Sequence, residues 1–108
     1  MEESKELAEK AKEMESRLNN RITAFVEGKE EIDVLKEDMH ETLYELELMK
    51  DRLRSNFFAV LGLPEEEYDG EAREKVKIIG HYREEVEEIF NKLKNDSYLL
   101  SGYYYARK

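Results

Sequence analysis

Apolar residues recur along three segments of this chain at alternating steps of three and four positions. This spacing places them on one side of an α-helix, because about 3.6 residues complete each turn. The pattern therefore predicts three amphipathic helices, at about residues 3–27, 30–61 and 71–104. Their apolar stripes are Leu7, Ala11, Met14, Leu18, Ile22 and Phe25; Ile32, Leu35, Met39, Leu43, Leu46, Met49, Leu53, Phe57 and Val60; and Val76, Ile79, Val86, Phe90, Leu93, Leu100 and Tyr104.

Turn-forming residues separate the three segments. Ser4 stands just before the first apolar positions and is a plausible N-cap. Gly28 ends the first helix if it takes the left-handed conformation, and Gly62 before Leu63-Pro64 ends the second. We expect a loop over residues 62–70, with a short helical turn after Pro64.

The third stripe keeps its phase over a long distance, with Arg83 and Ser97 at two of its steps. Because the phase survives through residues 95–97, we predict one continuous helix to about residue 104. The alternative is a break at Asn95, which turn-forming neighbours would tolerate. Gly80 weakens this helix by about 1 kcal/mol relative to alanine.

The sequence contains no strand pattern and no internal repeat. The gap between the first two stripes is short, which predicts antiparallel neighbours. We therefore expect an all-α, elongated, up-down-up antiparallel three-helix bundle with coiled-coil-like packing, forming one domain over residues 1–108. The long second helix also leaves an apolar stripe available for self-association, so a homodimer is a further possibility.

Composition narrows the classes of function. Charged residues make up 42 % of the chain, which has a net charge of −9 and no cysteine. Residues 1–90 carry 14 basic and 26 acidic groups, a net charge of −12, which argues against nucleic acid and anionic membrane as partners. We find no signal peptide and no apolar run of about 18 residues, so we expect a cytoplasmic protein without membrane insertion.

Residues 91–108 differ from the rest, with four basic groups and one acidic group. Cations favour the carboxyl end of a helix, which accounts for Lys92, Lys94, Arg107 and Lys108 without any partner. Contact with a partner is the alternative explanation.

The sequence contains no complete motif for a metal site or a catalytic site. Glu37-x-x-His40 matches one element of a di-iron bundle, but such a site needs a second element, and His81 has no glutamate three positions before it. The acidic runs lack calcium-loop spacing. Neither histidine belongs to a nucleophile–base motif, and no phosphate-binding loop is present. We therefore expect no metal, no cofactor and no enzymatic activity.

The last turns of the chain are unusually aromatic, since residues 98–108 hold four of its seven tyrosines. Tyrosine is enriched at protein interfaces because it offers a large contact area and a polar tip. Leu100 and Tyr104 lie on the third stripe, so they also fit the core. We nevertheless predict a partner-binding surface formed by Tyr98, Leu99, Leu100, Tyr103, Tyr104 and Tyr105.

Several local patterns together resemble the FlgN-type flagellar export chaperones over about residues 11–105. They are Phe25-Val-Glu-Gly28, Glu31 to Leu35, Leu46-x-x-x-Lys50-x-Arg52 through Leu61-Gly62-Leu63, and Asn95-Asp-Ser-Tyr98-Leu99-Leu100-Ser101-Gly-Tyr103. The most specific are the Leu-Gly-Leu helix end and the Leu-Leu-Ser-x-x-Tyr ending.

This resemblance implies a non-enzymatic chaperone that binds the helical terminus of a hook–filament junction protein before type III export. It also implies that the carboxy-terminal helix, including Tyr98, Leu99, Leu100, Tyr103 and Tyr104, contacts the client and helps docking at the export gate. The alternative is a structural homo-oligomeric scaffold or adaptor without a client, in which the same residues form the core of a dimer.

Overall fold

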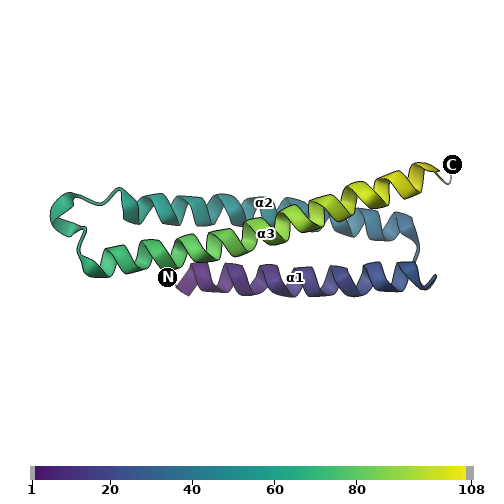
Figure 1. Cartoon of the computed structure of the whole chain (residues 1–108), viewed down its shortest axis with the longest axis horizontal. Coiled ribbons are helices and arrows are strands. Elements are labelled where there is room, and N and C mark those ends of the chain that lie inside the picture. Colours follow the sequence, from purple (N-terminus) through teal and green to yellow (C-terminus); the bar gives the residue numbers. More distant parts are fainter. Residues whose placement is uncertain (1, 107–108) are drawn as a thin grey trace.

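The computed structural model describes residues 2–106, which form three long helices and one short helical turn (Figure 1). Helix α1 spans Glu2–Val26, α2 spans Ile32–Leu61, the 3₁₀ turn η1 spans Glu65–Glu67, and α3 spans Gly70–Ala106. The predicted all-α class with three helices is confirmed, and no strand occurs within residues 2–106.

The helices lie along one another in a rod of 61 × 20 × 15 Å. Each helix contacts both others, and the contact between α2 and α3 is the most extensive. Figure 1 shows that α1 starts part-way along the α2–α3 pair, so two helices alone extend to the η1 end of the rod. None of the described helices combines the length and apolar character needed to cross a membrane.

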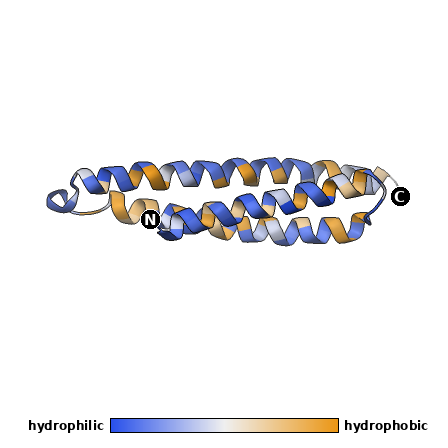
Figure 2. Ribbon diagram, turned by 90° about the horizontal axis from the view of Figure 1, so that it is seen from below, coloured by the Kyte–Doolittle hydropathy of each residue, from blue (hydrophilic) through white to orange (hydrophobic). Residues whose placement is uncertain are grey.

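Each helix buries the stripe that its sequence predicts, and every residue of the three stripes is at least half-buried. Figure 2 shows the resulting alternation of hydrophilic and hydrophobic residues along the helices. Small residues outside the stripes also enter the interior, among them Ala8 and Ala72. The core consists mainly of Ala11, Met14, Leu18, Leu35, Met39, Leu46, Met49, Leu53, Val86, Ile89, Phe90, Leu93 and Leu100.

The prediction that Ser4 caps α1 is wrong. The helix already includes Glu2, and the Ser4 side chain is fully buried, where its Oγ accepts a hydrogen bond from Asn56 Nδ2 at 3.3 Å. A small polar residue at an apolar-phase position resembles a cap in sequence, but here it allows close approach of α2.

The turn between α1 and α2 depends on Gly28, whose φ is +79°. Its N–H donates to Phe25 O, and the next amide, on Lys29, donates to Ala24 O. Helix α2 begins at Ile32, two residues later than predicted, because residues 28–31 form the turn. Glu30 is held there by Arg21 of α1.

Replacing Gly28 by alanine is expected to lower the free energy of unfolding by about 1–2 kcal/mol, because a Cβ disfavours positive φ. Gly102 provides the matched control: it lies inside α3, and an added Cβ there meets no atom within 4 Å. Gly102→Ala should therefore leave stability unchanged or raise it by up to about 1 kcal/mol. Urea unfolding measures the stability of both variants. A shift of both unfolding midpoints in the same direction would contradict this account.

Helix α3 is continuous through residues 95–97. Asp69 Oδ1 accepts a hydrogen bond of 2.9 Å from Ala72 N–H and so caps its first turn. Gly80 lies beside the Phe57 ring of α2, and a Cβ added there would lie 3.4 Å from that ring, an ordinary van der Waals contact. The packing of α2 against α3 therefore does not itself require a glycine at this position.

Candidate partner-binding surface

The six predicted partner-binding residues do not form one surface, because the last turns of α3 point them in different directions. Leu100 is 7 % exposed and packs in the core, so it does not face a partner. Tyr104 is half-buried toward α2, where Lys36 Nζ lies 4.3 Å from its ring centroid. Four residues remain exposed, and they divide into two pairs.

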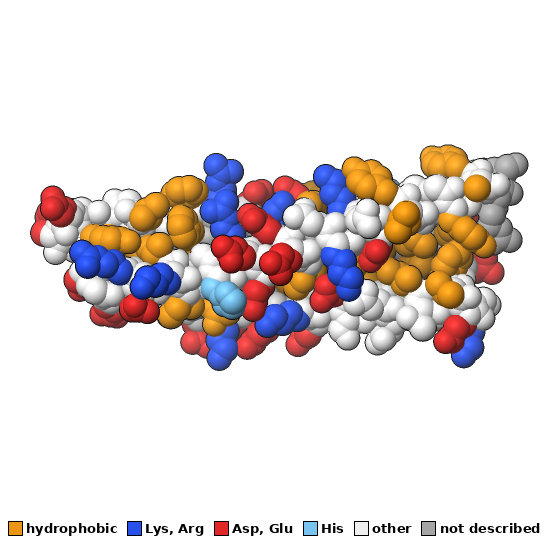
Figure 3. Space-filling view, viewed as in Figure 1, with side chains coloured by type: hydrophobic (Ala, Val, Ile, Leu, Met, Phe, Trp, Pro, Cys, Tyr) orange, Lys and Arg blue, Asp and Glu red, His pale blue; other side chains and the backbone are white. Residues whose placement is uncertain are grey.

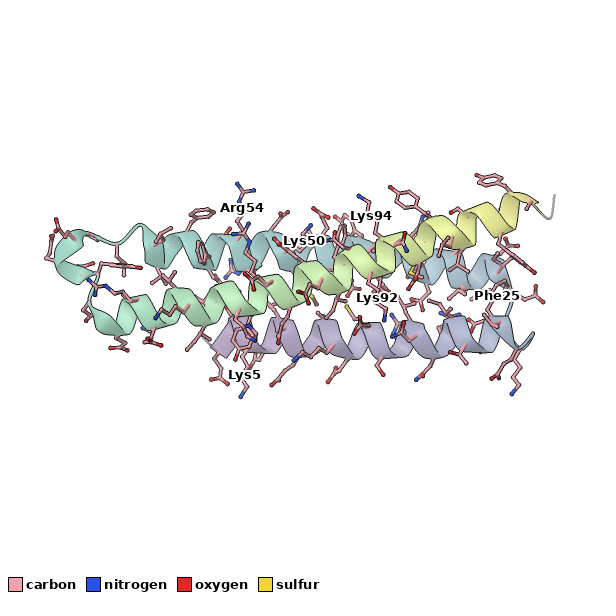
Figure 4. The ribbon with its side chains drawn as sticks, viewed as in Figure 1. Lys5, Phe25, Lys50, Arg54, Lys92 and Lys94 are labelled. Atoms are coloured by element: carbon pink, nitrogen blue, oxygen red, sulfur yellow. The ribbon has the colours of Figure 1, made fainter. Side chains whose placement is uncertain are left out.

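The first pair, Leu99 and Tyr103, lies one helical turn apart on the side of α3 that faces α1. Leu99 is 66 % exposed and Tyr103 is 48 % exposed. The Tyr103 ring packs edge-on against Phe25 of α1, with 5.3 Å between ring centroids. Figure 4 labels Phe25 near the ends of α1 and α3. The contact joins two segments that are 78 positions apart in sequence.

Further apolar side chains lie near this contact at the same end of α1. Val26 is 77 % exposed, and Ile22 is half-buried one turn before it. We call these five residues the terminal patch: Ile22, Phe25, Val26, Leu99 and Tyr103. Figure 3 shows apolar side chains gathered at this end of the rod. The α1 contribution escaped sequence reasoning, because Ile22 and Phe25 belong to a core stripe and the stagger between helices is not encoded locally.

The second pair, Tyr98 and Tyr105, is 67 % and 69 % exposed. These tyrosines are seven positions apart, so they lie on one side of α3. That side differs from the side of Leu99 and Tyr103 by roughly a third of a turn or slightly more. The tyrosine-rich end therefore presents two separate surfaces.

A charged network fixes the end of α1 that carries part of the terminal patch. Arg17 and Arg21 both donate hydrogen bonds to the Asp38 carboxylate of α2, and Arg17 Nη2 donates to Thr42 Oγ1 at 2.9 Å. Arg21 also donates to Glu30 in the turn, and this bond, followed by the one to Asp38, raises the pKa of Arg21. The network thus joins α1, the turn and α2.

Two opposing effects act on the pKa of Asp38. Burial of the carboxylate raises it, but the hydrogen bonds and positive charges of Arg17 and Arg21 together outweigh burial and hold the pKa below its ordinary value. Because the pKa of Asp38 is lower in the folded than in the unfolded protein, ionised Asp38 stabilises the fold. This stabilisation is fully present above the unfolded pKa of about 3.9. It is lost as the pH falls through the folded pKa.

Asp38→Asn is therefore expected to reduce the free energy of unfolding by about 1 kcal/mol at pH 7, a value that allows for the partial exposure of the arginines. The difference from the unsubstituted protein should shrink at acidic pH, once Asp38 is protonated. Asp51→Asn, on the exposed side of α2, is the matched control and should have little effect. Denaturant unfolding between pH 2.5 and 7 measures both. A loss of stability in Asp38→Asn that persists undiminished at the lowest pH would contradict the role of the charge.

A shallow hollow of about 430 Å³ lies between α1 and α3 and is lined mostly by charged residues: Lys12, Glu15, Glu85, Glu88, Ile89 and Lys92. Its charged groups pair with one another, as in Lys12 with Glu85 at 3.5 Å and Lys92 with Glu15 at 3.6 Å. This pattern is typical of salt-bridged helix surfaces.

The residues considered for metal binding do not converge. Glu37 and His40 are both exposed on α2, and His81 is exposed on α3, where its Nε2 lies 3.2 Å from Glu85. Within the described part of the chain, no group of three or more potential ligand side chains is placed to hold a metal ion.

Comparisons with protein-family models, curated proteins and solved structures yield no match to this chain. The resemblance to FlgN-type chaperones consequently remains a prediction from local sequence patterns.

Proposed function

We propose that this chain is a non-enzymatic binding module that holds an amphipathic helix of a protein partner on the terminal patch. The observation that carries the proposal is the exposure of Val26, Leu99 and Tyr103 at the end of the rod where the Phe25–Tyr103 contact joins α1 to α3. Contiguous apolar side chains on a protein surface mark interaction sites more often than isolated ones do.

The arrangement of the terminal patch in two ridges favours a helical partner. Leu99 and Tyr103 form one ridge, and Ile22 and Val26 form a second ridge one helix away. A partner helix with apolar residues at steps of three and four can place its anchors between two such ridges. Phe25 and Tyr103 supply the large aromatic area that commonly dominates binding energy.

The helical arrangement assumed here is the up-down-up antiparallel bundle with coiled-coil-like packing. The reversal of the chain at both connections in Figure 1 supports this order. With it, the ends of α1 and α3 lie at the same end of the rod, as the contact between Phe25 and Tyr103 requires.

The more specific proposal is a cytoplasmic flagellar export chaperone. Its client would be the helical terminus of a hook–filament junction protein, kept competent for type III export, and the same region would assist docking at the export gate. The motif ending in Leu99, Leu100 and Tyr103 supports this proposal, together with the acidic surface, which discourages nonspecific adhesion.

Calorimetric titration with a peptide spanning the client's terminal helix tests the proposal. We expect saturable one-to-one binding. Point substitutions in the terminal patch are better variants than truncation, because removing residues 96–108 would also remove Leu100 from the core. An absence of binding at peptide concentrations of about 100 μM would refute the flagellar client. Binding that is unaffected by substitutions in the terminal patch would refute the patch as the binding site.

The scaffold alternative retains one specific supporting observation. Tyr98 and Tyr105 are exposed on a side of α3 that is separate from the terminal patch. A helix-binding site on one side leaves these two tyrosines without an assigned role.

A further inference from the structure

The outer side of α3 carries a regular stripe that the proposed function does not use. Positions along it recur at steps of three and four, so they lie on one line of the helix. It begins with a glycine and two acids, passes an exposed asparagine and a lysine, and ends with two exposed tyrosines. The outer stripe consists of Gly80, Glu84, Glu87, Asn91, Lys94, Tyr98, Ser101 and Tyr105.

Aromatic side chains of α2 adjoin the glycine end of the outer stripe. Phe57 packs over Gly80, and its ring meets Phe58 edge-on with 5.4 Å between centroids. Phe58 is 48 % exposed and Leu61 is 45 % exposed. Figure 3 shows apolar side chains gathered toward both ends of the rod, with charged side chains between them.

We propose that a second copy of this chain binds along the outer stripe in antiparallel orientation, with the two-fold axis at Asn91. Asn91 lies near the middle of the stripe, eleven positions after Gly80 and fourteen before Tyr105. The aromatic residues at the η1 end of one copy then meet the tyrosines Tyr98 and Tyr105 of the other. By symmetry this contact occurs twice, and the dimer is closed.

The charges along the stripe favour this register. Glu87 and Lys94 lie on opposite sides of Asn91 at nearly equal distances, so each meets its opposite charge across the axis. Lys94 lies beside the Phe90 ring, at 5.8 Å from its centroid, rather than beside a carboxylate of the described residues. Glu87 accepts from Arg83 at 3.2 Å, and a carboxylate can accept from a second cation as well. A parallel dimer would instead place Glu87 against Glu87.

The size of the surface is sufficient. From Gly80 to Tyr105 the stripe is roughly 38 Å long at about 1.5 Å per residue. A strip of this length on a rod 20 Å wide presents on the order of 700 Å² per copy, close to the ~800 Å² per partner of a stable interface. Opposed asparagines at the axis would fix the register at some cost in affinity. We therefore expect a dimer with a dissociation constant in the micromolar range.

Charge exchange across the axis gives a direct test. Light scattering at about 100 μM should yield twice the chain mass of 12.9 kDa. Glu87→Lys and Lys94→Glu should each weaken the dimer at least tenfold, because each places like charges opposite each other twice. The double variant Glu87→Lys/Lys94→Glu should restore the dimer. Glu13→Lys, on the exposed side of α1, changes the net charge by the same amount as Glu87→Lys and should leave the dimer intact.

Cysteine substitution tests the orientation, since the chain contains no cysteine of its own. Asn91→Cys should form a disulfide with its own copy, because only a residue at the axis approaches its symmetry mate closely enough. Tyr105→Cys should not, because in the antiparallel dimer its two copies lie roughly 42 Å apart along the helices. A parallel dimer would cross-link both variants.

A monomeric mass at 100 μM, or a dimer that cross-links through Tyr105→Cys, would overturn the proposal. So would a double variant that remains as weak as the single variants while its helical circular dichroism is unchanged. None of these outcomes bears on client binding, because the outer stripe and the terminal patch share no residue.

Discussion

Leu46→Ala is expected to lower the free energy of unfolding by about 2–5 kcal/mol, one of the largest effects of any single substitution in this chain. Leu46 is 0 % exposed and belongs to the central core cluster of the three helices. Removing three carbons there loses burial and leaves a cavity that straight helices fill poorly. Since small domains are stable by only about 5–15 kcal/mol, urea unfolding should show a large fall in midpoint.

Leu48→Ala is the matched control for this experiment. The residue lies two positions away on the same helix and is 51 % exposed. The same chemical change should therefore cost much less, within about 1 kcal/mol. Equal losses in the two variants would mean that the sides of α2 are not buried as described.

Leu99→Glu is expected to weaken client binding at least 30-fold, or by about 2 kcal/mol. The substitution puts a charge among apolar anchors, where the bound partner would deprive it of water. Because Leu99 is 66 % exposed in the free protein, folding should be nearly unaffected. Calorimetric titration gives the affinity, and circular dichroism verifies the fold.

Tyr44→Glu controls for the general effect of adding an acid to this acidic chain. Tyr44 is 68 % exposed on α2, and it does not belong to the terminal patch or to the outer stripe. The affinity of the Tyr44→Glu variant for the client should match that of the unsubstituted protein. Comparable weakening in both variants would indicate simple repulsion by net charge and would remove the patch as the binding site.

The sequence predicted the helices well because each stripe reflects a single physical requirement, the burial of one side of a helix. Residues such as Leu18, Leu35 and Leu93 recur at helical spacing, and burial of one side of each helix follows. The left-handed conformation of Gly28 and the helix end at Gly62 were also predictable, because local backbone chemistry decides them. Ser4 was misassigned because a cap and a small buried residue look alike in sequence.

The candidate site was only partly predictable. The directions of Leu99, Tyr103 and Tyr98 on the helical wheel follow from their spacing alone. What covers each direction depends on where α1 ends relative to α3, and that stagger results from packing along the whole rod. For this reason the sequence predicted an aromatic binding end but gave no sign that Phe25 and Val26 lie beside it. The position of Leu100 and Tyr104 on the third stripe, by contrast, already indicated that they fit the core.

Hydrogen–deuterium exchange with and without the client's terminal helix examines the terminal patch most directly. Helix ends with few buried neighbours open readily, so the free protein should exchange rapidly at the carboxyl ends of α1 and α3. Binding is predicted to slow exchange at least about tenfold over residues 22–28 and 97–106 and to leave the η1 end unchanged. Slowed exchange at the η1 end alone, with both helix ends still exchanging freely in the complex, would contradict the account.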